Sequence, residues 1–146
     1  MVQALISIII PNWNGKGFLK DCLDSLRHQG FKDFEIIIVD NNSSDDSVLF
    51  LKENYPEVRI IALDTNKGFA GGVNEGIKAS KGDLIFLLNN DTVVDKDCLL
   101  TLYNAAIKNP QIGFFATKMI FYNTNPPVIN AAGDALGIDG AARNIG

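Results

Sequence analysis

Apolar and amphipathic stretches alternate along most of this chain. Apolar runs, several of them rich in β-branched residues, predict strands at residues 5–10, 34–39, 58–63, 83–88 and 112–119. Apolar residues at helical spacing predict helices at 18–27, after 46 to about 54, from 68 to about 80, and at 99–107. This alternation predicts an α/β fold, in which a mostly parallel sheet carries helices on both faces.

The strand predicted near residues 84–88 ends abruptly in polar residues. Its apolar residues do not alternate with polar ones, which is typical of a parallel strand buried on both faces. Asn89, Asn90 and Asp91 follow at once, at the edge where open α/β sheets bind ligands. Asp91 is therefore suited to hold a hard divalent cation against phosphate oxygens. Asn-Asp is also an ordinary turn after a strand, so this stretch alone leaves both interpretations open.

The first two predicted strands also end in polar residues. The first group is Pro11, Asn12, Trp13 and Asn14, and the second is Asp40, Asn41 and Asn42. Because the carboxyl ends of parallel strands meet at one edge, we expect these groups to converge on one crevice. Amides and carboxylates together supply the donors and acceptors that a nucleobase edge and a ribose require, and Trp13 offers a flat face for packing. The alternative is that the polar residues cap helices and make turns, and that Trp13 is core.

A glycine-rich stretch opens the helix predicted after residue 67. Gly68 and the free backbone N–H groups near it favour an anion such as a diphosphate, and Lys67 adds a positive charge. Gly71 and Gly72 follow within one turn. Their alternative role is to allow close packing between helix and sheet.

Composition excludes several classes of protein. The chain has 146 residues and a formal net charge of −4, which gives no basic surface for nucleic acid. Its apolar runs are too short to cross a bilayer, and Met1 lies so close to the first strand that we expect no signal peptide. Cys22 and Cys98 fall in helical patterns, so we expect two buried thiols, which fits a cytoplasmic protein. The single histidine, His28, is expected at the surface.

The pattern changes after residue 122. Residues 123–146 are rich in glycine and include Pro126 and Pro127, without a helical period. We therefore predict two parts, a ligand-binding α/β domain at 1–122 and the start of an incomplete second half at 123–146. Exposed apolar residues in this region, including Phe121 and Val128, favour self-association into a homo-oligomer.

Four motifs together resemble a known family. They are SIIIPNWNG at the first strand, IIIVDNNSSDDS at the second, NKGFAGGVNEGI before and within the third helix, and LIFLLNNDT at the fourth strand. In this order they resemble the N-terminal half of family 2 inverting glycosyltransferases, which have the Rossmann-like GT-A nucleotide-sugar-binding fold. The likeness covers about residues 6–119. The variants VDNNS and NNDT look most like the rhamnosyltransferase-like branch.

The resemblance implies a role for each candidate residue. The nucleotide-sugar-binding residues would be Pro11, Asn12, Trp13, Asn14, Asp40, Asn41, Lys67, Gly68, Asn74, Asn90 and Asp91. Asp91 would also bind Mg²⁺ or Mn²⁺, at the position of the family's DXD motif. The chain departs from the family at Asn41 and Asn89, where an Asp is common. An amide both donates and accepts, so the preferred base stays open, and one carboxylate grips a metal less firmly than two.

The implied function is a metal-dependent, inverting transfer of a sugar from a nucleotide-diphosphate sugar to a glycan or lipid-linked acceptor in polysaccharide biosynthesis. Rhamnose is one candidate sugar. The family's general base comes from the acceptor-binding half, and Asp134 and Asp139 are the only late carboxylates here. We therefore expect a truncated domain with little activity alone, located in the cytoplasm or peripherally at the inner face of the membrane.

Two other functions remain open on the sequence. One is a nucleotidyltransferase that makes nucleotide-sugars, although its basic glycine-rich loop after the first strand is replaced here by PNWNGKG. The other is a non-catalytic module that binds a nucleotide-sugar. A dinucleotide-binding glycine motif, a Walker A loop and a nucleophile elbow are absent from the sequence.

Overall fold

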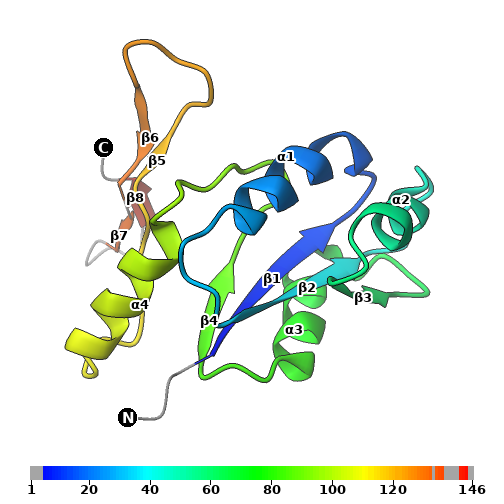
Figure 1. Cartoon of the computed structure of the whole chain (residues 1–146), viewed down its shortest axis with the longest axis horizontal. Coiled ribbons are helices and arrows are strands. Elements are labelled where there is room, and N and C mark those ends of the chain that lie inside the picture. The colour runs from blue at the N-terminus through cyan, green and yellow to red at the C-terminus, as the bar shows by residue number, and fades with distance from the viewer. Residues whose placement is uncertain (1–4, 133, 137–141, 145–146) are drawn as a thin grey trace. The chain divides into compact units, whose positions relative to one another are not determined.

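The computed structural model describes residues 5–132, 134–136 and 142–144. Its contacts divide the chain into two compact units, residues 1–101 and 102–146. The elements of the first unit are β1 (Ile6–Asn12), α1 (Lys16–Arg27), β2 (Phe34–Asp40), α2 (Ser47–Asn54), β3 (Arg59–Ala62), α3 (Gly68–Ala79) and β4 (Leu84–Leu87) (Figure 1). Helix α4 (Cys98–Lys108) crosses the division. Each predicted helix is present, with ends within a few residues of those expected.

Strands β1 to β4 form one parallel sheet in the order β3-β2-β1-β4. The chain moves outward from β1 through β2 to β3 and then returns to the other side of β1 as β4. Right-handed crossovers therefore put α1 and α2 on one face of the sheet and α3 on the other. The predicted α/β fold with helices on both faces is confirmed. The reversal of direction beside β1 makes the carboxyl ends of β1 and β4 the expected ligand-binding crevice.

Helix α3 lies directly on the sheet because Gly76 has no side chain. A Cβ at Gly76 would lie 2.4 Å from Ile9 Cγ2, which is closer than real contacts allow, and 3.1 Å from Val39 Cγ2, which is tight. Ile9 and Val39 form a fully buried core with Ile37 on this face. The close approach fixes α3, and with it the loop that precedes it, against β1 and β2.

Strand β4 corrects one expectation, because it is not buried on both faces. Ile85 and Leu87 are 41% and 48% exposed. They pair in register with Ser7 and Ile9, so they lie on the α3 face, but α3 packs on β1 and β2. Among the described strands β4 pairs with β1 alone and forms an edge. A continuous apolar run does not reveal whether a helix covers it.

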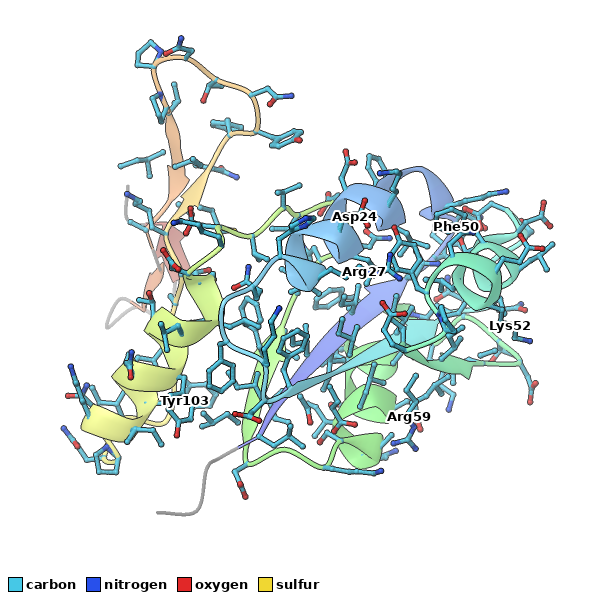
Figure 2. The ribbon with its side chains drawn as sticks, viewed as in Figure 1. Asp24, Arg27, Phe50, Lys52, Arg59 and Tyr103 are labelled. Carbon is cyan, nitrogen blue, oxygen red and sulfur yellow. The ribbon has the colours of Figure 1, made fainter. Side chains whose placement is uncertain are left out.

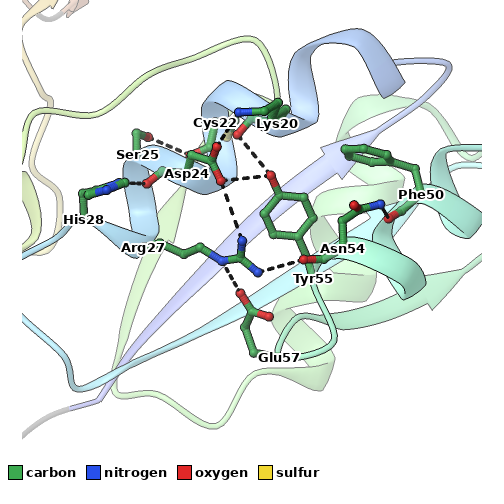
Figure 3. Close-up of polar contacts among 10 residues, drawn as sticks. All are labelled: Lys20, Cys22, Asp24, Ser25, Arg27, His28, Phe50, Asn54, Tyr55 and Glu57. Carbon is green, nitrogen blue, oxygen red and sulfur yellow. Dashed lines mark hydrogen bonds and ion pairs between the residues drawn. The ribbon is translucent and has the colours of Figure 1, made fainter.

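A side-chain cluster ties the C-terminal half of α1 to the end of α2 (Figure 3). The Tyr55 hydroxyl donates to Asp24 Oδ1 at 3.0 Å, and the Arg27 guanidinium lies 4.2 Å from the centre of the Tyr55 ring. Arg27 also donates to Glu57 at 2.7 Å and to the Asn54 carbonyl at 2.8 Å. Figure 2 shows Asp24 and Arg27 on α1, and Phe50 and Lys52 on α2. The cluster holds the two helices of one face together.

The second unit contains two short antiparallel pairs. Strand β5 (Met119–Ile120) pairs with β6 (Ile129–Ala131), and β7 (Asp134–Leu136) pairs with β8 (Ala142–Asn144). The predicted parallel strand at 112–119 is therefore wrong. Residues 112–118 have no regular structure, and the strand that begins at Met119 pairs with a segment about ten residues later in the chain. Strands β6 to β8 also give regular structure to a region predicted to have none.

None of the helices in the described part of the chain has the length and hydrophobicity needed to span a bilayer. Cys22 and Cys98 are free thiols, and Cys22 is buried as expected, whereas Cys98 is half-buried. His28 is exposed, also as expected. The compact units divide the chain after residue 101. This division of contacts does not test the functional division predicted between residues 122 and 123, which stays a prediction.

Candidate functional site

Asn12 joins three strand ends. Its side chain is 1% exposed at the end of β1. The Asn12 Nδ2 donates to Asp40 Oδ1 at 2.9 Å and to Ser43 Oγ at 3.2 Å. On its other side, Asn12 Oδ1 accepts from Asn90 Nδ2 at 2.8 Å. The structure therefore brings together the polar ends of β1, β2 and β4.

Asp40 and Asn41, at the end of β2, are both turned inward. They are 2% and 3% exposed. Asp40 Oδ2 accepts from the Ser43 N–H at 2.9 Å, so both carboxylate oxygens are bonded. Asn41 Oδ1 accepts from the Lys67 N–H at 3.1 Å, and Asn41 Nδ2 donates to the Gly68 carbonyl at 3.0 Å. The side chain of Asn41 thus holds the loop between β3 and α3.

The loop after β1 presents its side chains to solvent. Trp13 is 60% exposed, which excludes the alternative that it is core and leaves its ring free for packing. Asn14 has a φ of 49°, and it exchanges hydrogen bonds with the next loop: its N–H donates to Ser43 Oγ at 2.9 Å, and its Oδ1 accepts from the Ser44 N–H at 2.8 Å. Pro11 is half-buried. This loop forms an open, well-supported rim.

Asp45 ties this rim to the start of α2. Its Oδ2 accepts from the Lys16 N–H at 2.8 Å, and its Oδ1 accepts from the N–H and the hydroxyl of Ser47. Burial raises the pKa of Asp45, but these hydrogen bonds lower it by more, so the carboxyl has a pKa below its usual 3.8. The ionised form is therefore stabilised in the folded protein.

The residues expected near a diphosphate are less connected. The Lys67 ammonium lies 3.2 Å from Glu75 Oε1, which also pairs with Lys78. Gly68 and Asn74 are exposed. Of this group, only the backbone of Lys67 and Gly68 is tied to the buried network, through Asn41. Gly72 is buried against the Asn41 side chain, which agrees with its alternative role in close packing.

The segment after β4 differs because its side chains face solvent. Asn89 and Asp91 are exposed, and only Asn90 is partly turned inward. With the residues that the structure describes, the Asp91 carboxylate makes no hydrogen bond or ion pair. The described residues contain no group of three His, Cys, Asp or Glu that could hold a metal. One free carboxylate fits the mode in which Mg²⁺ binds through a single carboxylate together with substrate phosphates.

Helix α1 and Gln29, which lies two residues after the end of this helix, hold the backbone of this segment, which sequence reasoning missed. Cys22 Sγ donates to the Asn89 carbonyl at 3.8 Å, and Ser25 Oγ accepts from the Val94 N–H at 3.1 Å. Gln29, which is 1% exposed, donates to the Asp95 carbonyl at 2.7 Å and accepts from the Leu99 N–H at 3.1 Å. Positions 22 and 25 lie on one face of α1, and Gln29 follows four residues later in the sequence, so polar residues at this spacing beside a buried face were the available signal.

The environment of Cys22 makes it a supporting residue. Burial raises the pKa of its thiol to about 12, and the negative charge of Asp91 acts in the same direction. The thiol therefore stays protonated and donates to the Asn89 carbonyl.

The two late carboxylates considered for the general base give less information. Asp134 begins β7, and Asp139 lies outside the described residues.

Comparison with known proteins gives consistent matches. The model of Glycosyl transferase family 2 matches residues 7–131. The chain is 34% identical over 139 residues to the poly(ribitol-phosphate) beta-glucosyltransferase of Bacillus spizizenii, an alignment that covers 84% of this chain and 22% of the relative. It therefore spans about a fifth of that relative's length.

Two solved structures share the fold. One is Staphylococcus aureus TarS 1-349 in complex with UDP-GlcNAc, with a TM-score of 0.63, 21% identity, and coverage of 82% of this chain and 38% of that one. The other is the mannosyltransferase PcManGT from Pyrobaculum calidifontis in complex with GDP-Man and Mn²⁺, with a TM-score of 0.61, 20% identity, and coverage of 73% and 32%. The likeness agrees with the predicted GT-A type of α/β fold.

Proposed function

Because the chain belongs to glycosyl transferase family 2, we propose that it binds a nucleotide-diphosphate sugar and serves its transfer to a glycan acceptor. The observation that carries the proposal is the convergence of three polar strand ends on Asn12. Around that point the chain offers an exposed aromatic ring at Trp13 and a free carboxylate at Asp91. These are the groups that a nucleoside and a metal-bound diphosphate require.

The nucleoside end of the ligand belongs at β1 and β2. Trp13 packs against the base or ribose, and Pro11 and Asn14 shape the rim. The buried Asp40 and Asn41 support this surface from below. The nearby Lys67 and the N-terminus of α3, with Gly68 and Asn74, border the diphosphate or the sugar. Free N–H groups at a helix start favour this negative charge.

The metal end of the ligand belongs at Asp91. Asp91 would hold Mg²⁺ or Mn²⁺ together with the diphosphate, with Asn90 beside it. When bound, the cation neutralises charge that develops on the departing diphosphate. The PcManGT structure, which holds GDP-Man and Mn²⁺, supports this part of the proposal.

The reaction is an inverting transfer. An acceptor hydroxyl attacks the anomeric carbon, the new glycosidic bond forms as the bond to the diphosphate breaks, and a general base takes the hydroxyl proton. The base is not assigned to a residue of this chain. Rhamnose is one candidate for the transferred sugar. N-acetylglucosamine is a second candidate, because the TarS structure holds UDP-GlcNAc. A lipid-linked acceptor, a homo-oligomer and a cytoplasmic site of action, including the inner face of the membrane, belong to the same proposal.

Calorimetry with a panel of UDP-, dTDP- and GDP-sugars tests this function. We expect one base class to bind best and Mn²⁺ to tighten its binding relative to EDTA. Sugar transfer and nucleotide-sugar hydrolysis are measured alongside. Formation of a nucleotide-sugar from a nucleoside triphosphate and a sugar phosphate would point to a nucleotidyltransferase, and a failure to bind any member of the panel would overturn the proposal.

A further inference from the structure

The hydrogen bond between Asn12 and Asn90 exists because residue 15 has no side chain. Gly15 is buried at the start of α1. A Cβ at this position would lie 2.0 Å from Asn90 Nδ2 and 2.6 Å from Asn12 Oδ1. Its φ of −109° is open to any residue. Space for the Asn90 amide, and not backbone conformation, is what requires glycine here.

The direction of this amide chain is fixed by Asp40. A carboxylate oxygen only accepts, so Asn12 must turn its Nδ2 toward Asp40. Asn12 Oδ1 then faces Asn90 and accepts a hydrogen bond from Asn90 Nδ2. The Asn90 Oδ1 is left as the free acceptor of that amide. The charge at the end of β2 thus decides which atom the end of β4 presents to a ligand.

We propose that Asn12 and Gly15 are positioning residues that orient Asn90, so that its Oδ1 is presented beside Asp91 as a second oxygen for the metal-diphosphate end of the ligand. The inference rests on the proposed function of this site. It assigns Asn12 no ligand contact, since the side chain is 1% exposed and both of its polar atoms are bonded. Orienting Asn90 in advance also removes an entropic cost that binding would otherwise carry.

The first test compares Gly15→Ala with Gly17→Ala. Gly17 lies two residues later, and a Cβ there meets nothing within 4 Å, which makes it a matched control. UDP binding is measured by calorimetry with Mn²⁺ and with EDTA. We expect Gly15→Ala to reduce the Mn²⁺-dependent gain in UDP affinity about tenfold and to change affinity in EDTA less than about twofold, as for the loss of one well-oriented polar contact.

Other outcomes of this comparison decide against the inference. If Gly15→Ala lowers both affinities together with the melting temperature, the glycine serves folding alone. If Gly15→Ala and Gly17→Ala behave alike, the space beside Asn90 has no role in binding. Gly17→Ala itself is expected to bind like the unmodified chain in both conditions.

A double-mutant cycle tests whether Gly15 acts through Asn90. Asn90→Ala removes the amide that the new methyl group would displace. In a chain that already carries Asn90→Ala, we therefore expect Gly15→Ala to reduce the Mn²⁺-dependent gain in UDP affinity by less than about a further twofold. The reason is that the two changes remove one shared interaction. Additive losses would show that Gly15 acts on something other than Asn90.

A measurement without ligand separates this inference from the proposed function. In the unmodified chain and in Gly17→Ala, the side-chain NH₂ of Asn90 should give NMR signals typical of a hydrogen-bonded amide that exchanges slowly. Gly15→Ala should abolish them. If the unmodified chain binds no UDP-, dTDP- or GDP-sugar but shows these signals, the proposed function fails and the positioning of Asn90 stands. An Asn90 amide that exchanges freely in the unmodified chain refutes the positioning.

Discussion

The ends of β2 and β4 are built in opposite ways, although both are polar and both lie at the same edge of the sheet. At the end of β2, Asp40 and Asn41 are buried and use their side chains to bond the chain itself. At the end of β4, Asn89 and Asp91 are exposed, and the side chains of Cys22 in α1 and of Gln29 after this helix bond the backbone at Asn89 and Asp95. The side chains at the end of β2 bond the protein itself, whereas those of Asn89 and Asp91 after β4 face solvent and are available to a ligand.

This difference separates residues that build the site from residues that can meet a ligand. A buried amide with both polar atoms bonded has nothing left to offer without breaking an internal bond. An exposed carboxylate such as Asp91, with its backbone neighbours fixed from below, is both available and held in place. Asn90 stands between the two cases, since its Nδ2 is committed to Asn12 and its Oδ1 is not.

The largest expected effect comes from releasing the segment after β4 from Gln29, which lies two residues after the end of α1. Gln29→Leu keeps the volume of the buried side chain but leaves the Asp95 carbonyl and the Leu99 N–H without their partner. We expect a loss of about 2 to 4 kcal/mol in the free energy of unfolding, because two polar groups lose their hydrogen bonds. Urea denaturation measures this loss. Asp21→Asn, an exposed residue of α1, is the control and should stay close to the unmodified chain.

The next effect concerns the exposed end itself. Asp91→Asn keeps the shape of the side chain but removes the one carboxylate directly after β4. We expect the Mn²⁺-dependent part of nucleotide binding to fall by about 2 kcal/mol, by analogy with charge-assisted contacts. Stability should be unaffected, since the Asp91 side chain bonds nothing in the described structure.

Calorimetry with Mn²⁺ and with EDTA measures the effect of Asp91→Asn. The control is Asp97→Asn, an exposed carboxylate six residues later in the same segment. It should leave metal-dependent binding intact. Equal affinity with and without the metal in the unmodified chain would remove the metal role of Asp91.

The contrast between the two strand ends also marks how far the sequence could predict this site. The convergence of polar strand ends followed from the predicted parallel direction of the strands, because parallel strands share a carboxyl edge. The inward direction of Asp40 and Asn41 did not follow, since an Asx residue after a strand reads the same whether it bonds a loop or a ligand. Trp13 was left between core and ligand, and its 60% exposure decides for the surface.

Two misses have a common physical cause. The apolar run of β4 predicted a doubly buried strand, and residues 112–119 predicted another parallel strand. Local composition records the tendency of a segment to form a strand but not which element will pair with it or cover it. Ile85 is exposed because α3 packs on the neighbouring strand β1 and on β2 beyond it. The strand at Met119 pairs within a hairpin instead of joining the sheet. Both outcomes depend on tertiary partners.

A smaller effect tests the structural role of the buried end. Asn41→Asp replaces a donor with an acceptor opposite the Gly68 carbonyl, 3.0 Å away. We expect a loss of about 1 kcal/mol in stability, because one hydrogen bond is lost and two acceptors face each other. The control is Asn42→Asp, an exposed neighbour at a φ of 64°, where Asp is tolerated.

The ranking of UDP, dTDP and GDP in Asn41→Asp distinguishes two roles for this residue. If Asn41 only holds the loop that carries Lys67 and Gly68, all three affinities fall together. A changed ranking would instead show that Asn41 reads the base, as the resemblance to the family implies, and would move the end of β2 closer in kind to the end of β4.

The smallest expected effect is on stability, comes from Asp45 in the loop after β2, and depends on pH. Asp45 has a pKa below its ordinary value of 3.8 in the folded protein, so its hydrogen bonds to Lys16 and Ser47 add stability above that value and lose it as pH falls through the lower, folded pKa. Asp45→Asn should cost a few tenths of a kcal/mol from about pH 5 to 7, reduced by solvent screening. Urea denaturation across pH should show the two curves converging below pH 3.8. In a chain that already carries Ser47→Ala, which removes one donor to Asp45, the difference in stability caused by Asp45→Asn should be smaller. A difference that persists at low pH would show that Asp45 stabilises the rim by packing and not by charge.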